Sequence, residues 1–145
     1  MVKTTEMLVE DMMKPANTIK KGTEITEAVH LLKSKSIEFL SVVDEEHRLL
    51  GVVSENSLIK LVKHEPSSPV GDPVWFDSIE GEAGKRTVET IMTTNITTIK
   101  PKDDIATTLK VMDSVDYKLI HVVDPDGRLL GTVRMREIFE KILGV

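Results

Sequence analysis

The sequence contains no cysteine among its 145 residues, and it is poor in aromatic side chains. Without cysteine, the chain can form no disulfide, no zinc–thiolate site and no thiol nucleophile. One Trp, one Tyr and three Phe are too few rings for a platform on which single-stranded nucleic acid stacks. The core must therefore be built from Val, Ile, Leu, Ala and the seven Met residues.

Positive charge is not in excess, because 19 Lys and Arg stand against 24 Asp and Glu, for a formal net charge of -5. Non-specific binding of nucleic acid needs a basic footprint, so we expect no nucleic-acid partner. No apolar run approaches the roughly 20 residues of a membrane helix, and the polar segment 1–6 is unlike a signal peptide. We expect a soluble, cytoplasmic protein with no membrane span.

What the sequence does contain is an internal duplication. Phe39–Asp44 recurs as Leu119–Asp124, and Arg48–Val53 recurs as Arg128–Val133 at the same offset. Shorter matches extend the duplication upstream: Thr18–Lys20 with Thr98–Lys100, and Val9 and Met13 with Val88 and Met92. The matches keep Gly51 and Gly131 as well as the apolar pattern, which argues against chance.

The duplication divides the chain into a first repeat at 8–63, a linker at 64–86 and a second repeat at 87–145. The linker is rich in Pro, Ser and Gly, which is typical of a loop. It also holds the only Trp, in Val74-Trp75-Phe76. Because an exposed Trp–Phe pair is unfavourable, we expect this segment to dock on the protein, either over the core or as a lid over a ligand cleft or dimer contact.

Each repeat is predicted to have the order β-α-β-β-α. Apolar residues at helical spacing begin at Ile25 and Ile105, and Thr23-Glu24 and Asp103-Asp104 stand where helix caps are expected. The predicted strands are around 18–19, 40–43 and 49–53, and around 98–99, 120–123 and 129–133; the predicted closing helices are around 58–62 and 138–143. We expect the strand–helix–strand step to be parallel, the methionines that open each repeat to pack in the core, and His121 to be partly buried.

This ordered set, present twice, resembles the CBS domain, a family named for cystathionine beta-synthase. The resemblance implies an α/β fold, formally α+β, in which two CBS repeats pack as a pseudo-two-fold module that often forms a homodimer. It also implies a function, because such modules bind adenosine nucleotides or S-adenosylmethionine in two clefts between the repeats. They act as sensors and not as catalysts.

An adenosine ligand needs an apolar slot for the base, a hydrogen-bonding group for the ribose, and positive charge or free helix N–H groups for phosphate. In the family, Thr or Ser follows the last strand, and an Asp three residues later holds the ribose. The first repeat has Ser54 and Ser57 at these positions, and the second has Arg134 and Glu137. A Ser accepts fewer hydrogen bonds than a carboxylate, and Glu137 is longer than the family's Asp.

Family members often carry a basic residue just before the second strand, aimed at phosphate, and Lys118 occupies that position whereas Glu38 in the first repeat does not suit it. The Ser54 and Ser57 cleft with Lys118 is therefore the better conventional site, and the cleft with Arg134, Arg136 and Glu137 is expected to prefer a more anionic ligand. The full candidate set for the ligand is Thr18, Ile19, Leu40, Val52, Ser54, Ser57, Thr98, Lys118, Ile120, Arg134, Arg136 and Glu137.

Each of these signals has a purely structural alternative. Ser54 and Ser57 are equally well explained as an N-cap and a first-turn polar residue. Arg134 and Arg136 suit a solvated or ion-paired start of a helix, although basic residues there oppose the helix dipole and a bound anion would relieve that cost.

No nucleophile–base set, phosphate-binding loop or dinucleotide motif is visible, and four scattered histidines make a poor metal site. We therefore predict no catalytic activity and no metal or required cofactor. The leading hypothesis is a sensor of AMP, ADP, ATP or S-adenosylmethionine that acts on a separate effector protein. The alternative is a ligand-free dimerisation or protein-interaction module with vestigial clefts.

Overall fold

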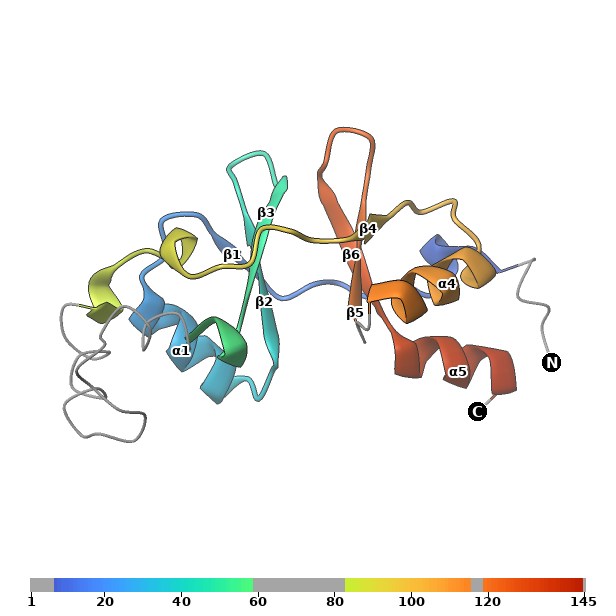
Figure 1. Ribbon diagram of the computed structural model, residues 1–145, viewed down its shortest axis with the longest axis horizontal. Helices are drawn as coiled ribbons and strands as arrows, with labels where there is room; N and C mark the ends of the chain where they lie inside the picture. Colours follow the sequence, from blue (N-terminus) through green and yellow to red (C-terminus); the bar gives the residue numbers. More distant parts are fainter. Residues whose placement is uncertain (1–6, 59–82, 116–118, 145) are drawn as a thin grey trace. The chain divides into compact units, whose positions relative to one another are not determined.

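The computed structural model describes residues 7–58, 83–115 and 119–144. The chain forms two compact units, one of residues 17–95 and one of residues 1–16 with 96–145. We call these the first unit and the second unit. Each unit contains its own three-stranded sheet, and the prediction of a mixed α/β fold built from two similar repeats is confirmed (Figure 1).

The first unit contains β1 (Thr18–Lys20), α1 (Ile25–Ser34), β2 (Phe39–Val43) and β3 (Leu49–Ser54). The sheet order is β1-β2-β3. As predicted, β1 runs parallel to β2 across the helical connection, and β2 and β3 form an antiparallel hairpin. Short 3-10 turns follow at Glu55–Leu58, Ala83–Lys85 and Val88–Thr90.

The second unit repeats this plan with β4 (Thr98–Ile99), α4 (Ile105–Val115), β5 (Leu119–Val123) and β6 (Leu129–Arg134). Its sheet order is β4-β5-β6, with the same parallel and antiparallel pairs. The chain closes with α5 (Met135–Leu143), as predicted, and Gly144 ends that helix in the left-handed conformation. The corresponding helix expected near residues 59–62 and most of the linker lie outside the described residues, as does Val74-Trp75-Phe76.

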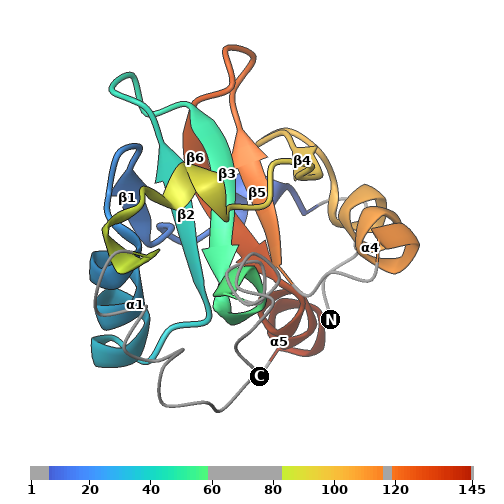
Figure 2. The same ribbon diagram turned by 60° about the vertical axis from the view of Figure 1, so that its left-hand side comes forward.

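The units are not the same segments as the sequence repeats, because each repeat's leading segment packs in the other unit. Residues 7–14, the first arm, belong to the second unit, and residues 87–93, the second arm, belong to the first unit. Figure 2 shows the first arm in blue near α4 and the second arm in yellow near β3. The arms place Val9 and Val88 fully buried in the two cores.

Backbone hydrogen bonds hold each arm against the start of a helix. The N–H of Ile25 donates to the carbonyl of Arg86 over 2.8 Å, just before the second arm, and the N–H of Ile105 donates to the carbonyl of Met7 over 3.1 Å. The first N–H groups of a helix have no partner inside it, so these segments supply the missing acceptors. Asp104 also caps α4 as expected, accepting from the N–H of Thr107, whereas the hydroxyl of Thr23 donates to the carbonyl of Lys20 and does not cap α1.

Each arm also forms an isolated antiparallel bridge with the third strand of its sheet. Val52 on β3 exchanges two backbone hydrogen bonds of 2.9 Å with Thr93, and Thr132 on β6 exchanges two of 2.8 Å with Lys14. Gly51 and Gly131 lie beside these contacts. A Cβ atom at Gly131 would come within 2.7 Å of the Lys14 carbonyl oxygen. The glycine that the duplication preserved therefore makes room for the arm.

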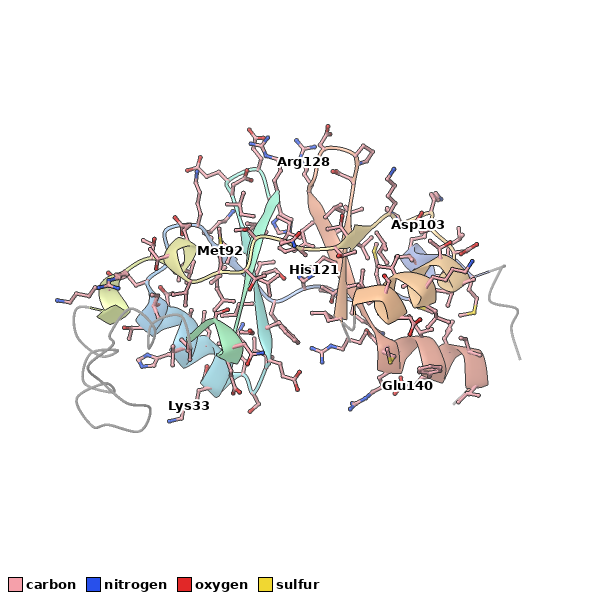
Figure 3. The ribbon with its side chains drawn as sticks, in the orientation of Figure 1. Lys33, Met92, Asp103, His121, Arg128 and Glu140 are labelled. Carbon is pink, nitrogen blue, oxygen red and sulfur yellow. The ribbon has the colours of Figure 1, made fainter. Side chains whose placement is uncertain are left out.

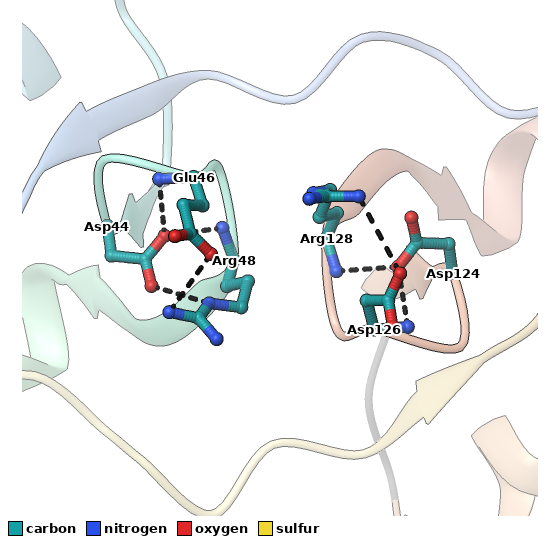
Figure 4. Close-up of polar contacts among 6 residues, drawn as sticks. All are labelled: Asp44, Glu46, Arg48, Asp124, Asp126 and Arg128. Carbon is teal, nitrogen blue, oxygen red and sulfur yellow. Dashed lines mark hydrogen bonds and ion pairs between the residues drawn. The ribbon is translucent and has the colours of Figure 1, made fainter.

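The two hairpins have closely similar bonds in their turns (Figure 4). The carboxylate of Asp44 accepts from the N–H groups of Glu46 and Arg48, each over 2.9 Å, and from the Arg48 guanidinium over 2.8 Å. These donors, the Arg48 N–H above all, hold the pKa of Asp44 below its ordinary value. Asp124 accepts in the same way from the N–H groups of Asp126 and Arg128.

Apolar side chains from the sheet, the helix and the arm make one core in each unit. The fully buried members include Ile25, Val42 and Val88 in the first unit, and Ile105, Ile120 and Val133 in the second. Met12 lies in the second core, as predicted for the opening methionines, and Met13 and Met92 pack against the cores. Among the helices that the structure describes, none is long and apolar enough to cross a membrane.

Candidate ligand-binding site

The candidate site begins where the last strand of each sheet ends. Ser54 ends β3 and Arg134 ends β6, and a helical turn starts at the next residue in both places. The N–H of Ser54 donates to the hydroxyl oxygen of Ser57 over 2.9 Å. The N–H of Arg134 donates to the Glu137 carboxylate, also over 2.9 Å. The two repeats thus form the same backbone-to-side-chain hydrogen bond at equivalent positions, although one uses a hydroxyl acceptor and the other a carboxylate.

This bond matches the structural interpretation of Ser57, because a polar side chain three residues into a helical turn satisfies an orphan donor. After this bond, the two side chains differ in the further hydrogen bonds that they can make. Ser57 is buried and keeps one O–H to donate. Glu137 is half-buried, and its second carboxylate oxygen is still able to accept hydrogen bonds.

The other candidates in the first unit differ in exposure. Thr18 is exposed on β1, Val52 and Ser54 are half-buried on β3, and Ile19 and Leu40 are buried in the core. The sheet register places Thr18 and Val52 on either side of Ser41. The polar candidates Thr18 and Ser54 thus lie on the two strands that flank β2, and the two buried apolar candidates serve in packing.

In the second unit, Thr98, Arg134 and Arg136 are exposed, and Ile120 is fully buried in the core. Lys118 lies outside the described residues. In the part of the chain that is described, no three His, Asp or Glu side chains converge on a metal position.

A pocket of about 480 Å³ opens beside Glu137 in the second unit. Ligand pockets commonly have volumes of roughly 300–1,000 Å³, so this one has room for a nucleoside-sized molecule. Its walls come from α5 and the first arm: Glu137, Glu140, Lys141 and Gly144 with Asp11, Met12 and Lys14. The carboxylates supply hydrogen-bond acceptors, and the two lysines supply donors.

Sequence reasoning missed Asp11, Lys14 and the α5 residues beyond Glu137. The first arm opens the first repeat in the sequence, so nothing in its order indicated that it lines a pocket with α5. One signal was available, because Val9 and Met13 match Val88 and Met92. That match shows that the arms are equivalent, but not which sheet each arm joins.

His121 lies on β5 (Figure 3), between Thr98 on β4 and Thr132 on β6 in the sheet register. It is 3% exposed, and is therefore more buried than the sequence suggested. Burial disfavours the charged imidazolium and lowers the pKa of His121 to about 4. The ring is therefore neutral at physiological pH and adds no positive charge for a phosphate.

A family model of the CBS domain matches residues 9–64 and 88–144. The chain is also 25% identical to the uncharacterised protein MJ1426 of Methanocaldococcus jannaschii, covering 94% of this chain and 92% of that one. It is 26% identical to a homoserine O-acetyltransferase of Methanohalobium evestigatum, covering 92% of this chain but only 23% of that enzyme.

Solved structures with the same fold include two that hold adenosine compounds. The structure of CBSX2 in complex with AMP has a TM-score of 0.75 at 22% identity, and covers 95% of this chain and 97% of that one. The CBS domain pair of MJ0100, in complex with 5′-methylthioadenosine and S-adenosyl-L-methionine, has a TM-score of 0.68 at 25% identity, with 94% and 96% covered.

Proposed function

Because this chain belongs to the CBS domain family, we propose that it is a regulatory module that binds an adenosine nucleotide or a related adenosyl ligand. One observation carries the proposal: the pocket in the second unit opens beside Glu137, at the position where the family resemblance expects the ribose-binding group. The ligand complexes of CBSX2 and MJ0100 support the choice of an adenosine compound.

The chemistry of the pocket suits this ligand class. Glu137 can accept from ribose hydroxyls with the oxygen that remains beyond its bond to the Arg134 N–H. Lys14 and Lys141 can donate to anionic groups. A ligand that contacts α5 and the first arm together favours the conformation in which both contacts are made, and regulation then follows from the shift in population.

We further propose that the chain works as a cytoplasmic homodimer and acts on a separate effector, without catalysis of its own. The exposed apolar side chains of Phe139 and Leu143, one helical turn apart on α5, support a surface for association. Light scattering in solution tests the dimer, and the mass of a single chain contradicts it.

Thermal unfolding of the full chain with and without AMP, ADP, ATP and S-adenosylmethionine at millimolar concentration tests ligand binding. We expect at least one ligand to raise the Tm by several degrees, because binding to the folded state alone stabilises it.

The variant Ser57→Asp tests the equivalent position in the first unit. One carboxylate oxygen can keep the bond from the Ser54 N–H while the other accepts from a ribose hydroxyl, so binding should tighten. The matched control Ser57→Asn keeps the first acceptor without adding the second charged oxygen. Binding that is equal in Ser57→Asp and Ser57→Asn argues against a ribose contact at this position.

A second candidate function is a protein-interaction module with no small-molecule ligand. The observation that favours it is that Ser57 and Glu137 both bond to the backbone of their own turns. Absence of a Tm shift with all four ligands would support this candidate over the sensor.

A further inference from the structure

The pocket beside α5 has an excess of negative charge on its walls. Three carboxylates line it, from Asp11, Glu137 and Glu140, against two lysines, Lys14 and Lys141. The sequence favoured an anionic ligand here because Arg134 and Arg136 were expected beside it. Neither arginine is among the residues that line the pocket, so the charge of this pocket comes from the three carboxylates and the two lysines.

The helix adds to this negative field. Gly144 lines the pocket and is the C-terminal cap of α5. The C-terminal end of a helix carries a partial negative charge from its unpaired carbonyl groups, which disfavours a nearby anion. The two lysines that oppose this field are exposed, and so are Asp11 and Glu140, so water and salt screen charges of both signs alike.

The charges are spread along one face of α5. Glu137, Lys141 and Gly144 follow one another at helical spacing, and Glu140, three residues after Glu137, lines the same pocket. At about 5.4 Å per turn, the face extends roughly 10 Å from Glu137 to Gly144. The opposite wall has Lys14, whose backbone is held by the two hydrogen bonds to Thr132.

An elongated ligand that places its ribose at Glu137 therefore extends its 5′ substituent past Glu140 and Lys141. A phosphate chain there meets repulsion from two further carboxylates and the helix end, and the two lysines balance the carboxylates but not the helix end. A substituent with a sulfonium or ammonium group meets Glu140 or Asp11 instead. If that substituent also has a carboxylate, Lys141 or Lys14 can pair with it.

We propose, building on the proposed function, that this pocket selects adenosyl ligands with a cationic or zwitterionic 5′ substituent over nucleotides with a phosphate chain. The selecting residue is Glu140, since it contacts no part of the adenosine in this arrangement and meets only the substituent.

Isothermal titration calorimetry of the full chain tests the selection, using S-adenosylmethionine, S-adenosylhomocysteine, AMP and ATP at low and at physiological salt. S-adenosylmethionine and S-adenosylhomocysteine differ in the sulfonium charge, and AMP and ATP differ in the length of the phosphate chain. We expect the affinity to fall from S-adenosylmethionine to S-adenosylhomocysteine, then AMP, then ATP. S-adenosylmethionine should bind about tenfold tighter than ATP at low salt, and the ratio should be smaller at physiological salt.

Two substitutions at neighbouring positions, each keeping the size of the side chain nearly unchanged, test which residue sets the ligand preference. Glu140→Gln should weaken S-adenosylmethionine several-fold and tighten ATP, whereas Lys141→Met, the matched control of opposite charge, should shift the ratio the other way. ATP binding more tightly than S-adenosylmethionine, or a preference that Glu140→Gln leaves unchanged, overturns the selection while the sensor function stands. If none of the four compounds binds, the proposed function fails as well.

Discussion

The two hairpins show how far equivalent positions can drift apart after a duplication. In both, an aspartate accepts the same pair of backbone N–H groups. The residue that must adopt a positive φ is Gly127 in the second repeat, at 85°, and His47 in the first, at 67°. A residue with a Cβ atom in this conformation costs about 1 kcal/mol. A solvent-exposed turn tolerates that cost, so the residue at this position differs between the two repeats.

The glycines beside the arms show the opposite behaviour. Gly51 and Gly131 have both been kept, and the structure gives the reason, since a Cβ atom at either position meets the arm that crosses the strand. Packing against the arm is therefore a stronger constraint at these positions than turn conformation is in the hairpins. Substitutions at three places in the fold test this contrast.

The largest effect is expected at the two glycines. A Cβ atom at Gly131 would lie 2.7 Å from the Lys14 carbonyl oxygen, which is backbone, whereas at Gly51 the nearest atom is the Met92 sulfur, at 2.5 Å. We expect Gly131→Ala to lower the free energy of unfolding by about 3 kcal/mol and Gly51→Ala by about 1–2 kcal/mol, because a side chain moves more easily than a paired strand.

Denaturant unfolding measures both changes. Adding Met92→Ala to Gly51→Ala should recover part of the loss, seen as a favourable coupling energy in a double-mutant cycle. Equal losses at the two glycines, or no coupling with Met92, would contradict the assignment of the two clashes.

An intermediate effect is expected from the central strands, where His121 stands at the position of Ser41. The pKa of His121 is about 4 in the folded protein and 6.5 as its ordinary value. The unfolded chain therefore binds more protons between these values, and stability that is complete above pH 6.5 is lost as the pH falls toward 4. The loss at pH 5 is roughly 2 kcal/mol.

Denaturant unfolding at a series of pH values checks this, with His121→Gln as the control that cannot titrate. The difference in stability between the two proteins should change with pH between about 4 and 6.5. Parallel pH curves for the two proteins would show that the buried histidine is not the cause.

The smallest effect is expected at the hairpin turns. Gly127→Ala should destabilise the protein by about 1 kcal/mol, because φ remains positive there. His47→Gly relieves the same strain but adds entropy to the unfolded chain, so the net gain should be no more than about 0.5 kcal/mol. Thermal unfolding resolves the signs, and a gain at Gly127→Ala would refute the comparison.

Much of the fold was predictable because it rests on local patterns. The apolar spacing from Ile25 and Ile105 and the paired strands of each hairpin identified the elements, and the duplication checked each prediction against a second copy. The exchange of the arms was not predictable. Pairing between Lys14 and Thr132 joins residues far apart in the sequence, and an alignment of the repeats to each other carries no information on which copy receives which arm.

The candidate site was predictable only in part, because it too depends on contacts between residues far apart in the sequence. The positions of Ser57 and Glu137 at a strand-to-helix junction followed from the motif, and the capping alternative described the bond of Ser57. The charge of the pocket did not follow, because it depends on which side chains of α5 and the first arm face each other. Arg134 and Arg136 are adjacent to Glu137 in the sequence, yet they are not on that wall.

The exchanged arms bear on the origin of the chain. A single-repeat ancestor with these contacts would have needed a second polypeptide to complete each core, so its folding would have depended on concentration. Gene fusion replaces that encounter by a tether with a high effective concentration. The fused protein can then keep its fold when dilute. The two repeats can also diverge, as they have where Ser57 carries a hydroxyl and Glu137 a carboxylate at equivalent positions.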